Sequence, residues 1–119
     1  MDELVARVQS QTDAYNRKDL AALLAGLADD YESWEVGADG PNCRARGREQ
    51  VSQALSAMFA ASGYARSSVE DLRAYGNIAV ALEIDTYQTA EGEQTRRSLG
   101  VYEFRDGALR RAWSFPVGA

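Results

Sequence analysis

The chain has 119 residues, and its content of 45% apolar and 26% charged residues is typical of one globular domain with one core. The formal net charge is -5 and the Lys and Arg residues form no cluster, which argues against a nucleic-acid partner. The opening Met1-Asp2-Glu3 is not a targeting signal, and no apolar run approaches the roughly 20 residues that a membrane helix needs. We therefore expect a single cytoplasmic domain over residues 1–119, with no membrane segment.

The residue types present restrict the possible chemistry. Cys43 is the only cysteine and histidine is absent, so an internal disulfide is excluded and a zinc site is not expected. The absence of an imidazole also excludes Ser-His-Asp and Cys-His nucleophiles. Acid-base chemistry would have to use Glu, Asp, Tyr or Lys, and we expect neither a metal nor a cofactor.

Two helices and a strand are predicted at the start of the chain. Apolar residues recur at steps of three and four from Asp2 to Tyr15, which predicts a helix. Asp19 can cap a second, leucine-rich helix that begins at Leu20 and ends in a turn at Asp29-Asp30. The alternation of residues then predicts a strand over Tyr31–Val36.

A loop, a short strand and a third helix are predicted next. Gly37–Pro41 contains the residues of a turn, and Asn42–Arg46 fits a short edge strand. Gly47 opens the third helix, which has an apolar face and is expected to end at Ser62-Gly63.

Four strands are predicted in the second half, where the apolar period changes to two. They are Ser67–Tyr75, Asn77–Thr89, Gln94–Arg105 and Ala108–Val117, joined by hairpin-like turns at Gly76, Ala90-Glu91-Gly92 and Asp106-Gly107. In the second of these strands, the alternating apolar residues from Ile78 to Ile84 are expected to face the core. Glu83 and Asp85 are then expected on the outer face, in cross-strand ion pairs.

Helices followed by an antiparallel meander predict an α+β fold with the helices on one face of the sheet. We expect a cone-shaped domain in which a curved antiparallel β-sheet wraps around the N-terminal helices and leaves a hydrophobic pocket on its concave face. The opposite face is expected to carry apolar residues such as Leu99 and Val101 among charged ones, which predicts a homodimer through the sheet.

The order of elements and several short segments resemble the nuclear transport factor 2-like superfamily. The segments are Tyr15-Asn16-Arg17-Lys18-Asp19-Leu20, Ala28-Asp29-Asp30, Gly47-Arg48-Glu49 and a closing aromatic strand. Within this superfamily the chain is most similar to the SnoaL-like and ketosteroid isomerase branch. The superfamily includes isomerases, polyketide cyclases, dehydratases, epoxide hydrolases and proteins without catalysis, so the resemblance implies a fold rather than one activity.

Ketosteroid isomerases use an Asp base in the first strand, with a Tyr and a protonated Asp that bind the enolate oxygen. On this resemblance, Glu35 falls at the base position when Ala28-Asp29-Asp30 is the anchor. The tyrosine position falls on Gln11 and the acid position on Gly100, so the chain departs from the pattern at both. The SnoaL-like cyclases chiefly need one pocket carboxyl that moves a proton beside a carbonyl, and Glu35 can supply it.

Glu35 is accordingly the predicted catalytic residue. Tyr31 and Ser33 are predicted ligand contacts beside it, because alternate residues of a strand share a face. The alternative is a half-exposed strand carboxylate, since a shift of one residue in register would turn Trp34 inward and Glu35 outward.

Six more ligand contacts are predicted on the first helix and the last two strands. They are Gln11, Tyr15, Tyr102, Arg111, Trp113 and Phe115. The two aromatic residues of the last strand are expected to share a face with Leu109 and form a pocket wall, to which Arg111 adds a cation. Gln11 and Tyr102 can donate hydrogen bonds to a ligand oxygen, and Tyr15 can cover the pocket mouth. Core packing, an ion pair or an internal hydrogen bond is the structural alternative in each case.

The expected function is therefore a cofactor-independent isomerase, cyclase or dehydratase for a small hydrophobic carbonyl compound, with Glu35 moving the proton. Gln11 and Gly100 at the donor positions favour an alternative, a ligand-binding or accessory dimeric module without chemistry. A structural dimer with a filled core is the third possibility.

Overall fold

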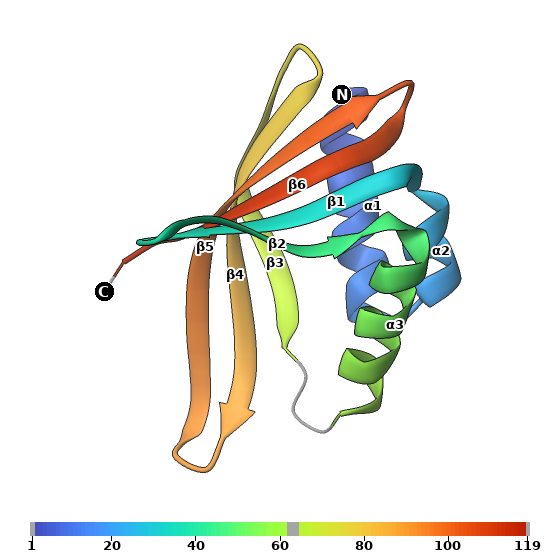
Figure 1. Cartoon of the computed structure of the whole chain (residues 1–119). Coiled ribbons are helices and arrows are strands. Elements are labelled where there is room, and N and C mark those ends of the chain that lie inside the picture. The colour runs from blue at the N-terminus through green and yellow to red at the C-terminus, as the bar shows by residue number, and fades with distance from the viewer. Residues whose placement is uncertain (1, 62–64, 119) are drawn as a thin grey trace.

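Helices gather on one side of an open, curved sheet in the computed structural model, which describes residues 2–61 and 65–118 (Figure 1). The helices are α1 (Glu3–Asn16), α2 (Leu20–Ala25) and α3 (Gly47–Ala60). The strands are β1 (Leu27–Gly37), β2 (Gly40–Arg46), β3 (Arg66–Tyr75), β4 (Ile78–Thr89), β5 (Gly92–Arg105) and β6 (Ala108–Pro116). They form a six-stranded sheet in the order β2-β1-β6-β5-β4-β3. The predicted α+β cone is confirmed, with one difference: β1 and β6 pair in parallel, while the other neighbours are antiparallel.

Caps and turns of the predicted kind delimit these elements. The Asp2 carboxylate accepts a hydrogen bond from the Leu4 amide at 2.8 Å and begins α1, and Asp19 caps α2 through the Ala22 amide at 3.1 Å. Between β5 and β6, Asp106 and Gly107 have φ values of 53° and 81°, as a type I′ hairpin turn requires. The predicted stop of the third helix at Ser62-Gly63 lies outside the described residues.

The core lies between the helices and the concave face of the sheet. Its buried members come from α1, α3 and five strands, and are Val8, Leu27, Tyr31, Ala45, Val51, Ala79, Phe104 and Leu109. Because the sheet curves away from the helices along the β4–β5 hairpin, this core fills only one end of the concave face (Figure 1).

The first strand begins four residues before its predicted start, and the predicted turn at Asp29-Asp30 is wrong. Both carboxylates find cations while the backbone stays extended: Asp29 pairs with Arg48 at 3.1 Å, and Asp30 pairs with Arg105 at 2.6 Å. Exposed ion pairs of this kind contribute little to stability. Leu27, Ala28 and Tyr31 of the same segment are buried, and this burial holds the backbone in the sheet, which no local pattern reveals.

The orientation of β4 is opposite to the predicted one. Ala79 and Ala81 are fully buried against the helices, at 0% exposure, and Glu83 and Asp85 follow them on the concave side and line a cavity. The apolar residues from Ile78 to Ile84 therefore point to the convex face. A period of two separates the two faces of a strand without saying which one meets the helices, and small alanines let α1 approach this sheet closely.

Candidate functional site

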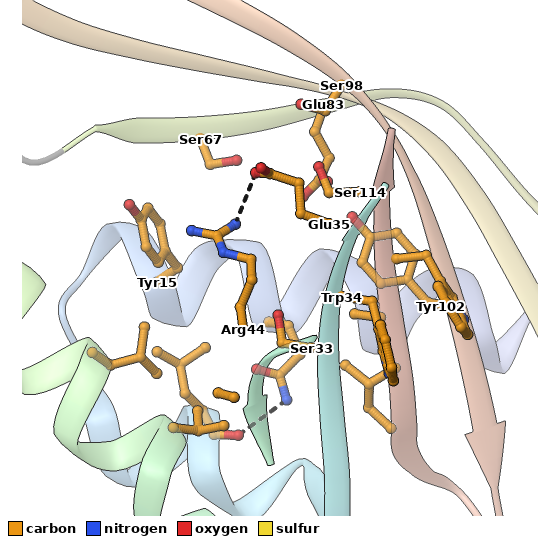
Figure 2. Close-up of a pocket in the computed structure, with 18 of the residues that line it drawn as sticks. Tyr15, Ser33, Trp34, Glu35, Arg44, Ser67, Glu83, Ser98, Tyr102 and Ser114 are labelled. Carbon is orange, nitrogen blue, oxygen red and sulfur yellow. Dashed lines mark hydrogen bonds and ion pairs between the residues drawn. The ribbon is translucent and has the colours of Figure 1, made fainter. Parts of the chain in front are cut away.

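A cavity of about 450 Å³ opens between the concave face of the sheet and the helices. Apolar residues such as Val51, Leu55 and Met58 line it from α3, while the strands contribute most of its polar residues (Figure 2). The cavity volume lies within the range of small-molecule sites, and mixed walls of this kind are typical of them. The polar groups of this cavity show what chemistry it can support.

Glu83 of β4 and Tyr102 of β5 form the shielded polar centre of this cavity. They come from paired strands and line the same cavity. They meet above Gly100, where a Cβ would lie 2.5 Å from the Tyr102 Oη and 2.7 Å from the Glu83 Oε2. The absence of a side chain at Gly100 therefore creates the space in which the carboxyl and the phenol meet.

The environment of this pair favours the neutral form of both groups. Burial raises the pKa of Glu83, the nearby Asp85 charge adds to this rise, and the hydrogen bond from Tyr102 and the charge of Arg96 oppose it only in part. Burial and the Glu83 charge also raise the pKa of Tyr102. In their neutral forms a carboxyl and a phenol can each donate a hydrogen bond, so this pair can serve an oxygen atom of a ligand.

Glu35, the predicted catalytic residue, also lines the cavity but has a different environment. Its side chain is 48% exposed, and its Oε2 lies 3.5 Å from Nη1 of Arg44. Figure 2 shows Glu35 pointing from β1 toward the Arg44 guanidinium. Glu35 is thus a solvent-accessible carboxylate beside a cation, in contrast to the shielded Glu83.

Tyr31 and Ser33 lie on the same side of β1 as Glu35 and line the cavity with it. Burial raises the pKa of Tyr31 to about 12. Trp34 borders the cavity, but its side chain lies on the other face of β1, where its Nε1 donates a hydrogen bond to the Glu32 carboxylate at 3.0 Å and its ring stacks on Trp113 of β6 with 5.3 Å between centroids. Of the two registers that the sequence left open, the structure therefore has the one in which Glu35 faces the cavity.

Gln11 and Tyr15 of α1 line the cavity and already have partners within the protein. The Gln11 amide donates to the Leu23 carbonyl at 3.3 Å, and the Tyr15 hydroxyl contacts the Met58 sulfur at 3.3 Å. Both arrangements are the structural alternatives given above, although neither prevents contact with a ligand.

Arg111 and Phe115 are absent from the described residues that line the cavity. The predicted face shared by Leu109 and Arg111 is wrong because Arg110 is an extra residue in β6: Phe104 pairs with Leu109, but Glu103 pairs with Arg111. Such a bulge reverses the alternation beyond it. Arg111 has its own acidic partners, Glu32 at 3.1 Å and Glu103 at 3.6 Å. Ligand contacts by Arg111 and Phe115 stay predictions.

The site contains two residues that sequence reasoning missed, Glu83 and Arg44. The available signal for Glu83 was the pair of small residues, Ala79 and Ala81, that precedes it on alternate positions of one strand. Arg44 had no comparable signal, because a bulge sets its direction.

Two searches of residues 2–61 and 65–118 gave negative results. These residues contain no group of three or more Cys, Asp or Glu side chains that could hold a metal ion. Nor does any helix in these ranges have the length and apolar character needed to cross a membrane.

Comparisons with solved structures place this fold among known ones. An M. tuberculosis LEH-like epoxide hydrolase is similar with a TM-score of 0.80 and 19% identity, over 97% of this chain and 83% of that one. TerC co-crystallized with polyporic acid gives a TM-score of 0.78 and 15% identity, over 98% and 92% of the two chains. A putative ketosteroid isomerase from Kribbella flavida gives a TM-score of 0.78 and 18% identity, over 98% of this chain and 79% of that one. At these identities the likeness concerns the fold alone.

Sequence comparisons add a family assignment. No curated protein matches the chain. A family model described as a SnoaL-like domain matches residues 8–112, which is most of the chain and includes Glu35, Glu83 and Tyr102. The chain therefore belongs to the SnoaL-like domain family, within the nuclear transport factor 2-like superfamily.

Proposed function

We propose that this protein is a cofactor-independent enzyme that moves a proton at a carbon next to a carbonyl in a small hydrophobic molecule. The observation that carries the proposal is the convergence of the Glu83 carboxyl and the Tyr102 phenol over Gly100, inside a cavity that a second carboxylate, Glu35, also lines. Two carboxyl groups held in contrasting environments are a recurrent arrangement for acid-base chemistry. Membership of a family that includes isomerases supports the same reaction class.

In this mechanism Glu35 is the general base and removes the proton from the carbon. The carbonyl oxygen gains negative charge, and the Glu83 and Tyr102 pair donates a hydrogen bond to it. A donor that is already in place for the charged intermediate binds it more strongly than the neutral substrate, which accelerates the reaction. Glu35 can then return the proton to another carbon, so the reaction needs no cofactor.

The two carboxyl groups fit these roles because of their environments. Solvent and Arg44 accompany Glu35, which suits a base that must be charged at the start of the reaction. Glu83 is suited to the neutral state in which a carboxyl donates a hydrogen bond, because burial raises its pKa. Of the two donors predicted from sequence, Gln11 and Tyr102, the phenol is the one that shares the shielded centre with a carboxyl.

Exchange of carbon-bound protons in D2O tests this proposal without knowledge of the natural substrate. Cyclic ketones of increasing size are incubated with the protein, and loss of the α-proton signal is followed by NMR. We expect exchange above the buffer rate, reduced about 10²–10⁴-fold in Glu35→Gln, since that is the usual contribution of a general base. The exchange rate of Tyr102→Phe should fall about 10²–10³-fold, as for removal of one oxyanion donor.

Glu70→Gln is the matched control, because Glu70 is an exposed residue of β3. It should exchange protons at the wild-type rate. Exchange by Glu35→Gln within about 3-fold of wild type would exclude Glu35 as the base, since this lies far below the general acid-base range.

A ligand-binding module without chemistry is the second candidate. One observation favours it: the Gln11 amide at the family's tyrosine position is already bonded to the Leu23 carbonyl. This candidate predicts that ketones bind in the cavity and that none of them exchanges protons above the buffer rate.

A further inference from the structure

A bulge in β2 turns Arg44 into the cavity. Ser33 pairs with Ala45 and Trp34 pairs with Cys43, so Arg44 is an extra residue without a partner on β1. Bulges commonly re-aim a side chain next to a site. As a result the adjacent residues Arg44 and Ala45 both line the cavity, and Figure 2 shows the guanidinium inside it.

The one ion pair that Arg44 forms with the described residues is loose. Its Nη1 lies 3.5 Å from the Glu35 carboxylate, and the two side chains are 52% and 48% exposed. By contrast, Arg46, two residues later in β2, holds Glu32 at 2.6 Å. An ion pair of 3.5 Å between exposed groups contributes little to stability. A guanidinium also has five N–H donors, more than this one contact can use. Most of the donors of Arg44 are therefore open to a ligand.

Two cations, Arg44 and Arg96, line the cavity, and Arg44 is the less firmly paired of the two. The Arg96 side chain is 64% exposed but donates a hydrogen bond to the Asp85 carboxylate at 3.3 Å, whereas Arg44 has only the looser contact with Glu35 at 3.5 Å. Glu83 is shielded and tends to the neutral form because burial raises its pKa. An anion that reaches Arg44 thus meets one exposed carboxylate, Glu35, which can rotate toward solvent.

We propose that Arg44 binds a carboxylate of the ligand, so that the protein selects small hydrophobic acids whose apolar body lies against α3. The planar guanidinium matches a carboxylate with two parallel hydrogen bonds. The statement that these acids are substrates rests on the proposed function, and it adds that the reacting carbonyl compound also has a carboxylate. Binding by Arg44 itself does not depend on catalysis.

Binding of a matched pair of probes tests this inference by calorimetry at pH 7.5. The probes are 2-naphthylacetate and 2-naphthylacetamide, which share the ring system and differ in charge. Wild type should bind the acid at least about 10-fold more tightly, since hydrogen bonds to charged groups contribute about 1.5–3 kcal/mol. Arg44→Gln should remove this preference while its affinity for the amide stays within about 2-fold.

Two further variants test whether the preference for the acid depends on the guanidinium shape of residue 44 and on a cation at that position rather than elsewhere in β2. Arg44→Lys keeps the charge without the planar fork and should retain part of the preference. Arg46→Gln removes a cation from the same strand, where it pairs with Glu32, and should leave the preference unchanged. Equal affinity of wild type for both probes, or no binding of either, would overturn the proposal, as would an unchanged preference in Arg44→Gln. Proton exchange is measured separately, so a failure of catalysis and a failure of acid binding are distinguishable.

Discussion

Substitution of Gly100 by Ala tests whether the space above this residue holds the Glu83 and Tyr102 pair. The new Cβ would lie 2.5 Å from the Tyr102 Oη, 2.7 Å from the Glu83 Oε2 and 2.9 Å from the Tyr102 Cζ, where ordinary contacts are 3.4–4 Å. The phenol and the carboxyl must then move by about 1 Å, and overpacking of this kind costs about 1–3 kcal/mol. The lower backbone entropy of Ala in the unfolded chain offsets about 0.4–1 kcal/mol of this.

We therefore expect Gly100→Ala to lower the free energy of unfolding by about 1–2 kcal/mol, which corresponds to a fall in Tm of about 3–10 °C for a domain of this size. Urea unfolding and thermal melting measure the loss, and ketone exchange should fall at the same time because the donor pair is displaced. Gly37→Ala is the control, since a Cβ at Gly37 has no atom within 4 Å. If Gly100→Ala matched this control in both stability and exchange, the reasoning about the pair would be refuted.

Three other predictions concern pH, association and the attachment of β3. Burial raises the folded-state pKa of Glu83 above its ordinary value of 4.5, so wild type should lose stability as the pH rises from about 4.5 through the folded pKa. The loss in free energy of unfolding is about 1.4 kcal/mol for each unit by which the folded-state pKa exceeds the unfolded-state pKa. Glu83→Gln should lack this loss in urea unfolding at pH 4 to 8, and parallel pH profiles would contradict the prediction. We also predict that two copies associate through the convex face of the sheet. Wild type should then sediment as a dimer at micromolar concentration, and Leu82→Glu should sediment as a monomer; a monomeric wild type would refute the prediction. The Asn16 side-chain amide is hydrogen-bonded to both the carbonyl and the amide of Ser67 in β3, at 2.7 and 2.8 Å. Asn16→Ala should therefore lower the free energy of unfolding in urea by about 1–3 kcal/mol. A loss below about 0.5 kcal/mol would show that these two hydrogen bonds are not needed to attach β3.

The order of helices and strands was predictable because its signals are local. Apolar spacing identified α1 and α3, the Asp19 cap marked α2, and Asp106-Gly107 marked the last hairpin. Each of these patterns acts through neighbours within a few residues, so a single sequence contains it in full. The resemblance to a superfamily could be read from the same order.

The inner wall of the site was harder to predict because it depends on distant contacts. The alternation in β4 was read correctly, but contact of Ala79 with the helices, which the pattern does not encode, decided that Glu83 faces inward. Bulges at Arg44 and Arg110 then changed which residues share a face. A bulge inserts one residue opposite a partner strand, so its position depends on pairing across the sheet rather than on the neighbouring residues.

The proposed chemistry requires a cavity carboxyl that stays protonated above its ordinary range and can donate a hydrogen bond. Titration of Glu83 by NMR, with carbon-13 at the glutamate Cδ and with Glu83→Gln to assign the signal, measures this directly. We expect Glu83 to titrate above 4.5, because burial outweighs the hydrogen bond from Tyr102, and we expect Tyr102→Phe to move its pKa still higher. A Glu83 signal that titrates at or below 4.5 would mean that the cavity holds no such donor.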